Sequence, residues 1–189
     1  VPDEYGNGFF TFIAEPDPDE GAVIDKVFTF IVDRSGSMSG NKIVQARNAA
    51  SFIVENLNEG DMFNIVDFSS SVSSFQPEHV PYTPSYEQDA LDYINDFYAS
   101  GSTNISGAFD TAVPMFNAAS EETANIIIFF TDGQATTGIT NTQQLVDHVH
   151  DLVAQTETNI FLYCFGIGMS ANQQLLSLLA QDNNGIAQF

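Results

Sequence analysis

VFTFIVDRSGSMSG, residues 27–40, is the stretch that decides the fold of this chain. Its first part, VFTFIVD at residues 27–33, is a nearly continuous apolar run, which is typical of a strand covered on both faces of a sheet. The run ends abruptly at Asp33, and a polar loop that contains glycine follows. Apolar residues then recur at helical spacing from Ile43 to Leu57. This order predicts a buried strand, a polar loop and an amphipathic helix.

The same alternation of strands and helices continues along the rest of the chain. Further strands are predicted at Met62–Phe68, Val72–Phe75, Ala124–Thr131, Asn159–Gly166 and Ile186–Phe189. Further helices are predicted at Tyr86–Tyr98, Ile105–Phe116, Thr142–Thr156 and Asn172–Ala180. Pro114 is expected to kink the second of these helices or to end it early. Strands that alternate with helices predict an α/β fold with a doubly wound, mostly parallel central sheet flanked by helices.

The charge and the length of the apolar runs exclude two classes of partner. The chain has 25 acidic and four basic residues, and a formal net charge of −21. This charge repels nucleic-acid phosphates and anionic membranes. No stretch approaches the roughly 20 consecutive apolar residues that a membrane-spanning helix needs. We therefore expect no nucleic-acid partner and no insertion into a membrane, and the sequence leaves the oligomeric state open.

The first 25 residues differ in composition from the rest. They are rich in Asp, Glu, Pro and Gly, apart from the short run Phe9–Ala14, which fits a strand. We interpret residues 1–25 as an acidic linker or the end of a preceding domain, and residues 26–189 as one domain. Because the chain begins at Val1, with neither an initiator Met nor a leader segment, we expect it to be a piece of a longer protein.

Three polar segments fall where a sheet of this kind binds its ligands. They are residues 33–37 after the first strand, residues 101–104 before a helix, and residues 131–133 after a long buried strand. In open α/β sheets, ligands bind beyond the carboxyl ends of the strands, where the strand order reverses. Ser35 and Ser37 stand two residues apart, so both hydroxyls can point inward from one tight loop, with Gly36 relieving the crowding between them.

The chemistry of these segments points to a hard cation. Carboxylate and hydroxyl oxygens suit magnesium, manganese or calcium, and the absence of nearby His or Cys argues against zinc or copper. Neutral hydroxyl ligands leave the charge of an ion unquenched. If Asp33 or Asp132 acts partly through water, the ion stays electrophilic and can accept an external carboxylate. That is a mechanism for binding, and it requires no reaction.

These segments also carry a family resemblance. DRSGSM at 33–38, GSTNI at 101–105 and TDG at 131–133 resemble the metal-ion-dependent adhesion site of von Willebrand factor type A domains. The resemblance covers roughly residues 26–189. FIVDRSGSMSG with KIVQAR, followed by DMFNIVDF, is most similar to the branch that includes inter-alpha-trypsin inhibitor heavy chains and their bacterial relatives.

The resemblance implies a ligand set and a function. One divalent cation would be contacted by three hydroxyls and ligated, directly or through water, by two carboxylates: Ser35, Ser37, Thr103, Asp33 and Asp132. An Asp or Glu of a protein partner would complete the shell. The chain would then be a binding module for adhesion or assembly, without enzymatic activity, in an extracellular or cell-surface setting.

Family members usually add a helix after the sixth strand, and the movement of this helix accompanies affinity switching in some of them. Because this chain stops at Phe189, the final helix is expected to be absent and no such regulation is inferred.

Two other functions remain alternatives. A phosphohydrolase keeps an aspartyl nucleophile where Asp33 stands, but such enzymes typically need a second acid two residues later, where this chain has Ser35. A structural domain with an idle metal site is the other alternative. Arg34, within the polar segment 33–37, either steers an acidic partner or neutralises nearby carboxylates. His148 and His150 point about 200° apart on a helix, so we expect surface residues there instead of a ligand pair.

Overall fold

The computed structural model describes residues 24–119 and 123–189. The strand expected at Phe9–Ala14, and the interpretation of residues 1–25 as a linker or the end of a domain, lie outside this part except for the last two positions. In the described part, no helix combines the length and the apolar character that crossing a membrane requires.

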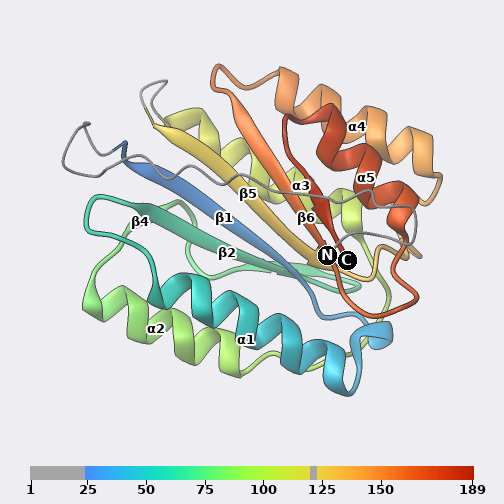
Figure 1. The fold of residues 1–189 in the computed structure, drawn as a ribbon, viewed down its shortest axis with the longest axis horizontal. Coiled ribbons are helices and arrows are strands. Elements are labelled where there is room, and N and C mark those ends of the chain that lie inside the picture. Colours follow the sequence, from blue (N-terminus) through green and yellow to red (C-terminus); the bar gives the residue numbers. More distant parts are fainter. Residues whose placement is uncertain (1–23, 120–122) are drawn as a thin grey trace, which may run out of the picture.

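The described chain alternates strands and helices around one sheet (Figure 1). The strands are β1 (Lys26–Asp33), β2 (Met62–Phe68), β3 (Val72–Ser74), β4 (Val80–Pro81), β5 (Ala124–Thr131), β6 (Ile160–Gly166) and β7 (Ala187–Gln188). The α-helices are α1 (Asn41–Glu55), α2 (Pro84–Asn95), α3 (Ile105–Ala112), α4 (Thr142–Ala154) and α5 (Gln173–Asp182). Two short 3₁₀ helices are η1 (Gly36–Met38) and η2 (Val113–Ala118).

The sheet confirms the predicted doubly wound topology. Its strand order is β3-β2-β1-β5-β6-β7, and β4 also pairs with β2. β1, β2, β5, β6 and β7 run parallel, whereas β3 and β4 are antiparallel to β2. From β1 the chain builds first toward β2 and later, on the other side of β1, toward β5. The strand order therefore reverses at β1, and the carboxyl ends of β1 and β5 flank the crevice where such sheets bind ligands.

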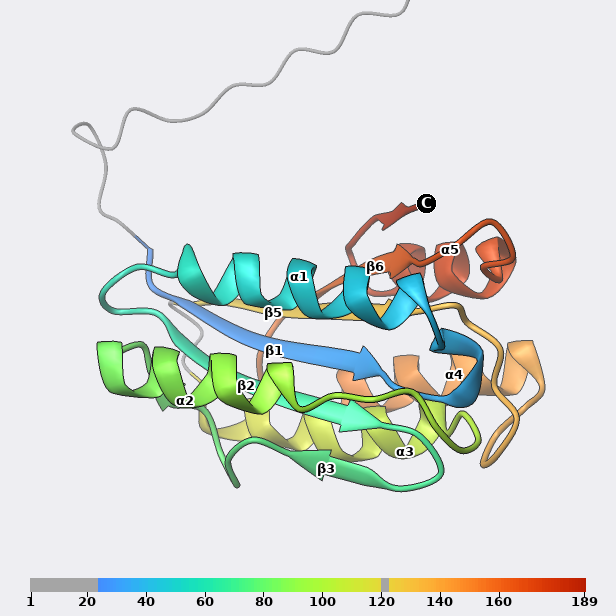
Figure 2. The same ribbon diagram turned by 90° about the horizontal axis from the view of Figure 1, so that it is seen from below.

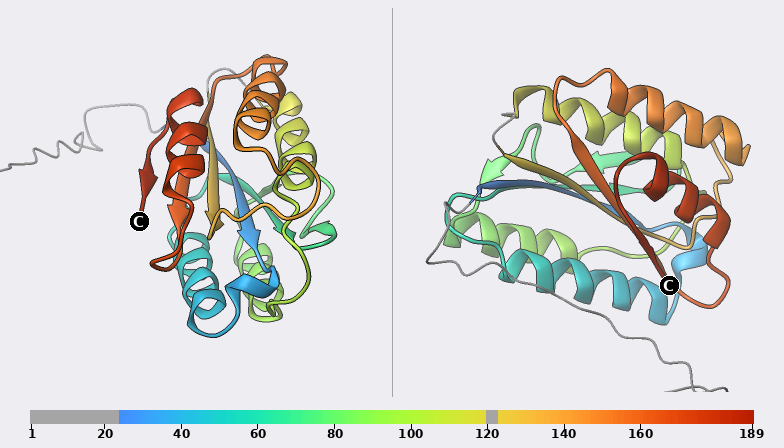
Figure 3. Two further views of the ribbon diagram at one scale, coloured as in Figure 1. Left: turned by 90° about the vertical axis from the view of Figure 1, so that its right-hand side faces the viewer. Right: turned by 45° about the horizontal axis from the view of Figure 1, so that its top comes forward.

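Helices cover both faces of the sheet, which explains why β1 is apolar along almost its whole length. Phe30 and Val32 belong to the core beneath α1 and α2, whereas Ile31, between them in the sequence, belongs to the core beneath α3, α4 and α5. Successive side chains of a strand point to opposite faces, so a strand buried on both sides needs apolar residues at consecutive positions. Figures 2 and 3 show α1 and α2 on one side of the sheet and α3 and α4 on the other.

The predicted helices differ from the structure at their ends: α4 ends at Ala154 and α5 spans Gln173–Asp182, and two further helices differ for reasons that the structure shows. The helix predicted at Tyr86–Tyr98 begins at Pro84, because the Thr83 hydroxyl accepts a hydrogen bond from the Tyr86 amide at 3.2 Å and caps it. It ends at Asn95, so Tyr98, the last residue of the predicted helix, lies outside it and is 67% exposed.

The helix predicted at Ile105–Phe116 ends as an α-helix at Ala112, and the chain continues as η2. Pro114 has no amide hydrogen to donate, so the early end that it predicted is confirmed. β4 was not predicted, because a strand of two residues carries no periodicity.

Candidate metal centre

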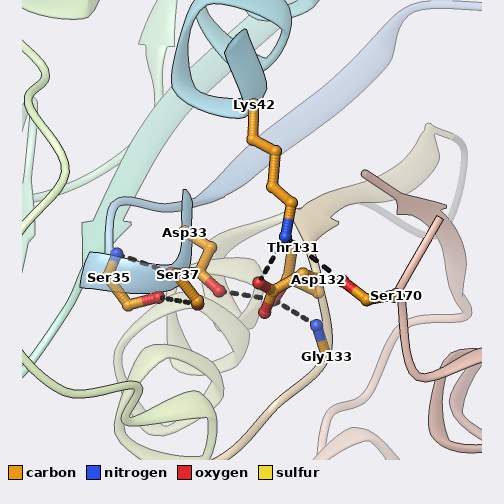
Figure 4. A network of polar contacts seen from close by, with 8 residues as sticks. All are labelled: Asp33, Ser35, Ser37, Lys42, Thr131, Asp132, Gly133 and Ser170. Carbon is orange, nitrogen blue, oxygen red and sulfur yellow. Dashed lines mark hydrogen bonds and ion pairs between the residues drawn. The ribbon is translucent and has the colours of Figure 1, made fainter. Parts of the chain in front are cut away.

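The candidate site lies at the carboxyl ends of β1 and β5, where Figure 2 shows β1 running toward η1 and the start of α1. β1 and β5 are parallel neighbours, with Val32 paired to Phe130. The residues that follow these two positions, Asp33 and Thr131, are therefore side by side. Figure 4 shows Asp33, Ser35, Ser37 and Asp132 gathered at this point.

Asp33 is fully buried, and both of its oxygens accept hydrogen bonds. The Ser35 amide donates to Oδ1 at 2.7 Å, and the Thr131 hydroxyl donates to Oδ2 at 2.5 Å. Thr131 Oγ1 in turn accepts from the Gly133 amide at 2.8 Å. These contacts fix the orientation of the carboxylate and tie the end of β1 to the end of β5.

A backbone contact holds residues 33–37, the serine loop, against residues 101–104, the Thr103 segment. The Ser35 and Ser37 hydroxyl oxygens lie 3.0 Å apart, as the spacing of these serines predicts. The Gly36 amide donates to the Gly101 carbonyl at 3.0 Å. A Cβ at Gly36 would lie 3.3 Å from that carbonyl oxygen, so the glycine allows the two loops to approach.

Thr103 is connected to the third loop as well. Its amide donates to the Thr136 hydroxyl at 2.9 Å, and its carbonyl accepts from the Thr136 amide at 3.0 Å. The Thr103 residue is only 2% exposed. Residues 101–104 therefore join the segment after β1 to the segment after β5. All five predicted ligand residues belong to three segments that contact one another, residues 33–37, 101–104 and 131–136.

Asp132 has an unusual hydrogen-bond pattern for a buried carboxylate. The residue is 1% exposed, and Lys42 Nζ lies 3.1 Å from Oδ2. Oδ1 is buried and has no hydrogen-bond partner in the described part of the chain. A buried carboxylate oxygen without a partner costs free energy unless a cation or a donor compensates it. This oxygen therefore supports the fit between the residues and a bound cation.

The electrostatics of the site agree with this fit. Burial raises the pKa of Asp33, and the neighbouring negative charge of Asp132 raises it further, against the lowering effect of the hydrogen bonds from Thr131 and Ser35. Two buried carboxylates that repel each other are stabilised by a positive charge placed near both. The described residues contain no group of three or more His, Cys, Asp or Glu side chains arranged for a metal. The donors here are instead the carboxylate and hydroxyl oxygens that hard cations prefer.

Two residues that shape this site were not predicted from the sequence as its members. Thr131 holds Asp33, and Lys42 holds Asp132. Lys42 is the first residue of KIVQAR, shortly after Ser37, but sequence spacing does not show that helix α1 directs it to Asp132, which follows β5.

The charged residues outside the ligand set lie as follows. Arg34 pairs with the buried Asp67 and lies over the Tyr98 ring, 5.8 Å from its centroid, so it neutralises a carboxylate of β2. His150 is exposed, and His148 is partly exposed and contacts Asp110 at 2.7 Å, which confirms the expectation that both histidines lie at the surface.

Comparisons with known proteins agree with this architecture. Residues 28–189 match the model of the von Willebrand factor type A domain. Human inter-alpha-trypsin inhibitor heavy chain H4 is 33% identical over 189 residues, covering 96% of this chain and 20% of that protein. The chain thus spans about a fifth of the length of the curated relatives that it matches.

Solved structures resemble the fold at low sequence identity. A von Willebrand factor type A protein from Catenulispora acidiphila has a TM-score of 0.77 and 20% identity, covering 87% of this chain and 38% of that one. The PilB minor pilin from Streptococcus sanguinis has a TM-score of 0.70 and 13% identity, covering 91% of this chain and 58% of that one.

Proposed function

This chain belongs to the von Willebrand factor type A domain family, and from that premise we propose that it is a protein-binding module for adhesion or assembly whose site holds one divalent cation. The observation that carries the proposal is Asp132 Oδ1, a buried carboxylate oxygen with no hydrogen-bond partner among the described residues, in a cluster with Asp33 and serine hydroxyls. A bound magnesium, manganese or calcium ion would supply an electrophilic centre for an Asp or Glu of the partner.

The five residues would contribute two kinds of ligand to such an ion. Ser35, Ser37 and Thr103 would contribute neutral oxygens, which leave the charge of the ion largely uncompensated. Asp33 and Asp132 would contribute the negative charge, directly or through water. The hydrogen bonds to Asp33 keep its carboxylate in place, so little ordering is needed when a ligand binds. We also propose an extracellular or cell-surface setting, which surface labelling of intact cells against lysed cells would test.

The first test is the response of metal-stripped protein to divalent ions. An ion that binds only the folded chain stabilises it, by ~2.7 kcal/mol at about a hundred times the Kd. For a domain of this size, we expect the melting temperature to rise by roughly 5–10 °C. Circular dichroism melts with magnesium, manganese or calcium measure this shift, and sodium chloride at equal ionic strength is the control. Unchanged melting at millimolar levels of all three ions would disprove the metal assignment and leave the structural domain with an idle site.

The phosphohydrolase alternative predicts turnover, and we expect none. Asp33 is fully buried and both of its oxygens accept hydrogen bonds, which disfavours attack on a substrate. Ser35 stands where a second acid would be needed. Incubation with p-nitrophenyl phosphate and p-nitrophenyl acetate in the presence of magnesium should give rates equal to those of buffer. Turnover that disappears in Asp33→Asn would instead establish the enzyme.

A further inference from the structure

Lys42 is a cation that the fold itself supplies to the candidate site. It lies near the start of α1, and its ammonium contacts Asp132 Oδ2 at 3.1 Å and the Ser170 hydroxyl at 3.4 Å (Figure 4). All four basic residues of the chain lie between positions 26 and 47, against 25 acidic residues. Basic residues are therefore scarce in this chain, and one of the four lies against a buried carboxylate of the candidate metal site.

Gly168 packs against the end of the Lys42 side chain. Gly168, in the loop between β6 and α5, has a φ of 86° and approaches the aliphatic part of the lysine. A Cβ at Gly168 would lie 2.7 Å from Lys42 Cε. The Lys42 side chain is 24% exposed and that of Asp132 is 2% exposed, so this pair is screened less by water than a surface pair.

We propose that Lys42 is a built-in competitor of the divalent ion, whose ammonium neutralises Asp132 in the ion-free protein and lowers the affinity of the site for metal. This inference rests on the proposed metal-binding function. The lysine occupies one oxygen of Asp132, while the other oxygen has no hydrogen-bond partner in the part of the chain that the structure describes and remains for the ion. A divalent ion near that carboxylate is repelled by the ammonium, so Lys42 raises the ion concentration at which the module becomes loaded. Ser170 gives the ammonium a second hydrogen-bond partner close by.

Lys42→Met tests the inference, because methionine keeps the aliphatic stem and removes the charge. In metal-stripped protein, Asp132 then becomes a buried charge without a counter-ion, and we expect a lower melting temperature than for the wild type. In manganese titrations by calorimetry, we expect binding roughly tenfold tighter. The increase in melting temperature caused by manganese should accordingly be larger in Lys42→Met than in the wild type.

Lys26→Met is the matched control. Lys26 lies 3.9 Å from Asp61, another buried carboxylate, but at the opposite end of β1. Lys26→Met changes the net charge by the same amount as Lys42→Met. A manganese affinity of Lys26→Met close to that of the wild type therefore excludes a general effect of net charge. Lys42→Arg keeps the positive charge and should bind manganese close to the wild-type level, which provides a folded variant if Lys42→Met is unstable.

The outcomes separate the two proposals. If the wild type binds manganese and Lys42→Met binds it equally or more weakly, Lys42 is not a competitor and this inference is wrong, while the proposed function stands. If neither protein binds any of the three ions, both proposals fall. Tighter binding in Lys42→Met together with a lower melting temperature of the stripped variant supports the inference.

Discussion

Asp132→Ala is expected to lower the affinity for manganese by at least about a hundredfold and to abolish the rise in melting temperature that the ion causes. The change removes one of the two buried carboxylates of the candidate site, and with it the oxygen that has no hydrogen-bond partner among the described residues. Loss of a residue that only supports a metal ligand commonly costs ten- to a hundredfold in affinity, so loss of a charged ligand should reach at least the upper end of that range. Calorimetric titration of metal-stripped protein measures the affinity.

The same variant should have a smaller effect on the stripped protein. Removing Asp132 also removes its repulsion of Asp33. It releases the ammonium of Lys42, whose side chain is partly exposed and can reach water. These effects offset the lost ion pair, so we expect the melting temperature without metal to change little.

Asp61→Ala is the matched control, and its expected pattern is the reverse. Asp61 is also buried and paired with a lysine, and it accepts hydrogen bonds from the amides of Lys26 and Asn58 at 3.0 and 2.9 Å. Its loss should lower the free energy of unfolding by about 2 kcal/mol or more, with unchanged affinity for manganese. A large loss of metal affinity in Asp61→Ala, or none in Asp132→Ala, would contradict the proposed site.

Sequence patterns predicted the long elements of this fold well, because the strands between helical layers are apolar at consecutive positions. β2 and β5 have the predicted bounds, and β1 begins one residue earlier. The errors lie at the ends of the helices and in the strand β4, which was not predicted. Helix ends depend on caps and on packing with other segments, which sequence periodicity does not contain.

The candidate site could be predicted only in part from the sequence. The order of the three loops indicated that Asp33 and Asp132 would meet, because β1 and β5 are neighbours at the point where strand order reverses. The partners of these carboxylates depend on side-chain directions across the sheet. Lys42 reaches Asp132 over a sequence separation of 90 residues, which no local pattern encodes.

Thr103→Ala is expected to separate metal binding from folding. The residue is buried and belongs to a segment that contacts both other loops of the site through backbone atoms. The substitution removes no charge and preserves those backbone contacts, so the loss of stability in stripped protein should stay near ~1 kcal/mol. If its hydroxyl contacts the ion, the affinity for manganese should fall roughly tenfold or more.

Thr103→Ser supplies the control, because it keeps the hydroxyl and removes only a methyl group. Its affinity for manganese should remain close to that of the wild type, whereas Thr103→Ala and Thr103→Ser should melt at similar temperatures without metal. Calorimetric titrations and melts of the two variants measure both quantities. Normal metal affinity in Thr103→Ala, while Asp132→Ala loses it, would show that the ligand set is wrong at Thr103 and that the ion is held by the loops after β1 and β5 alone.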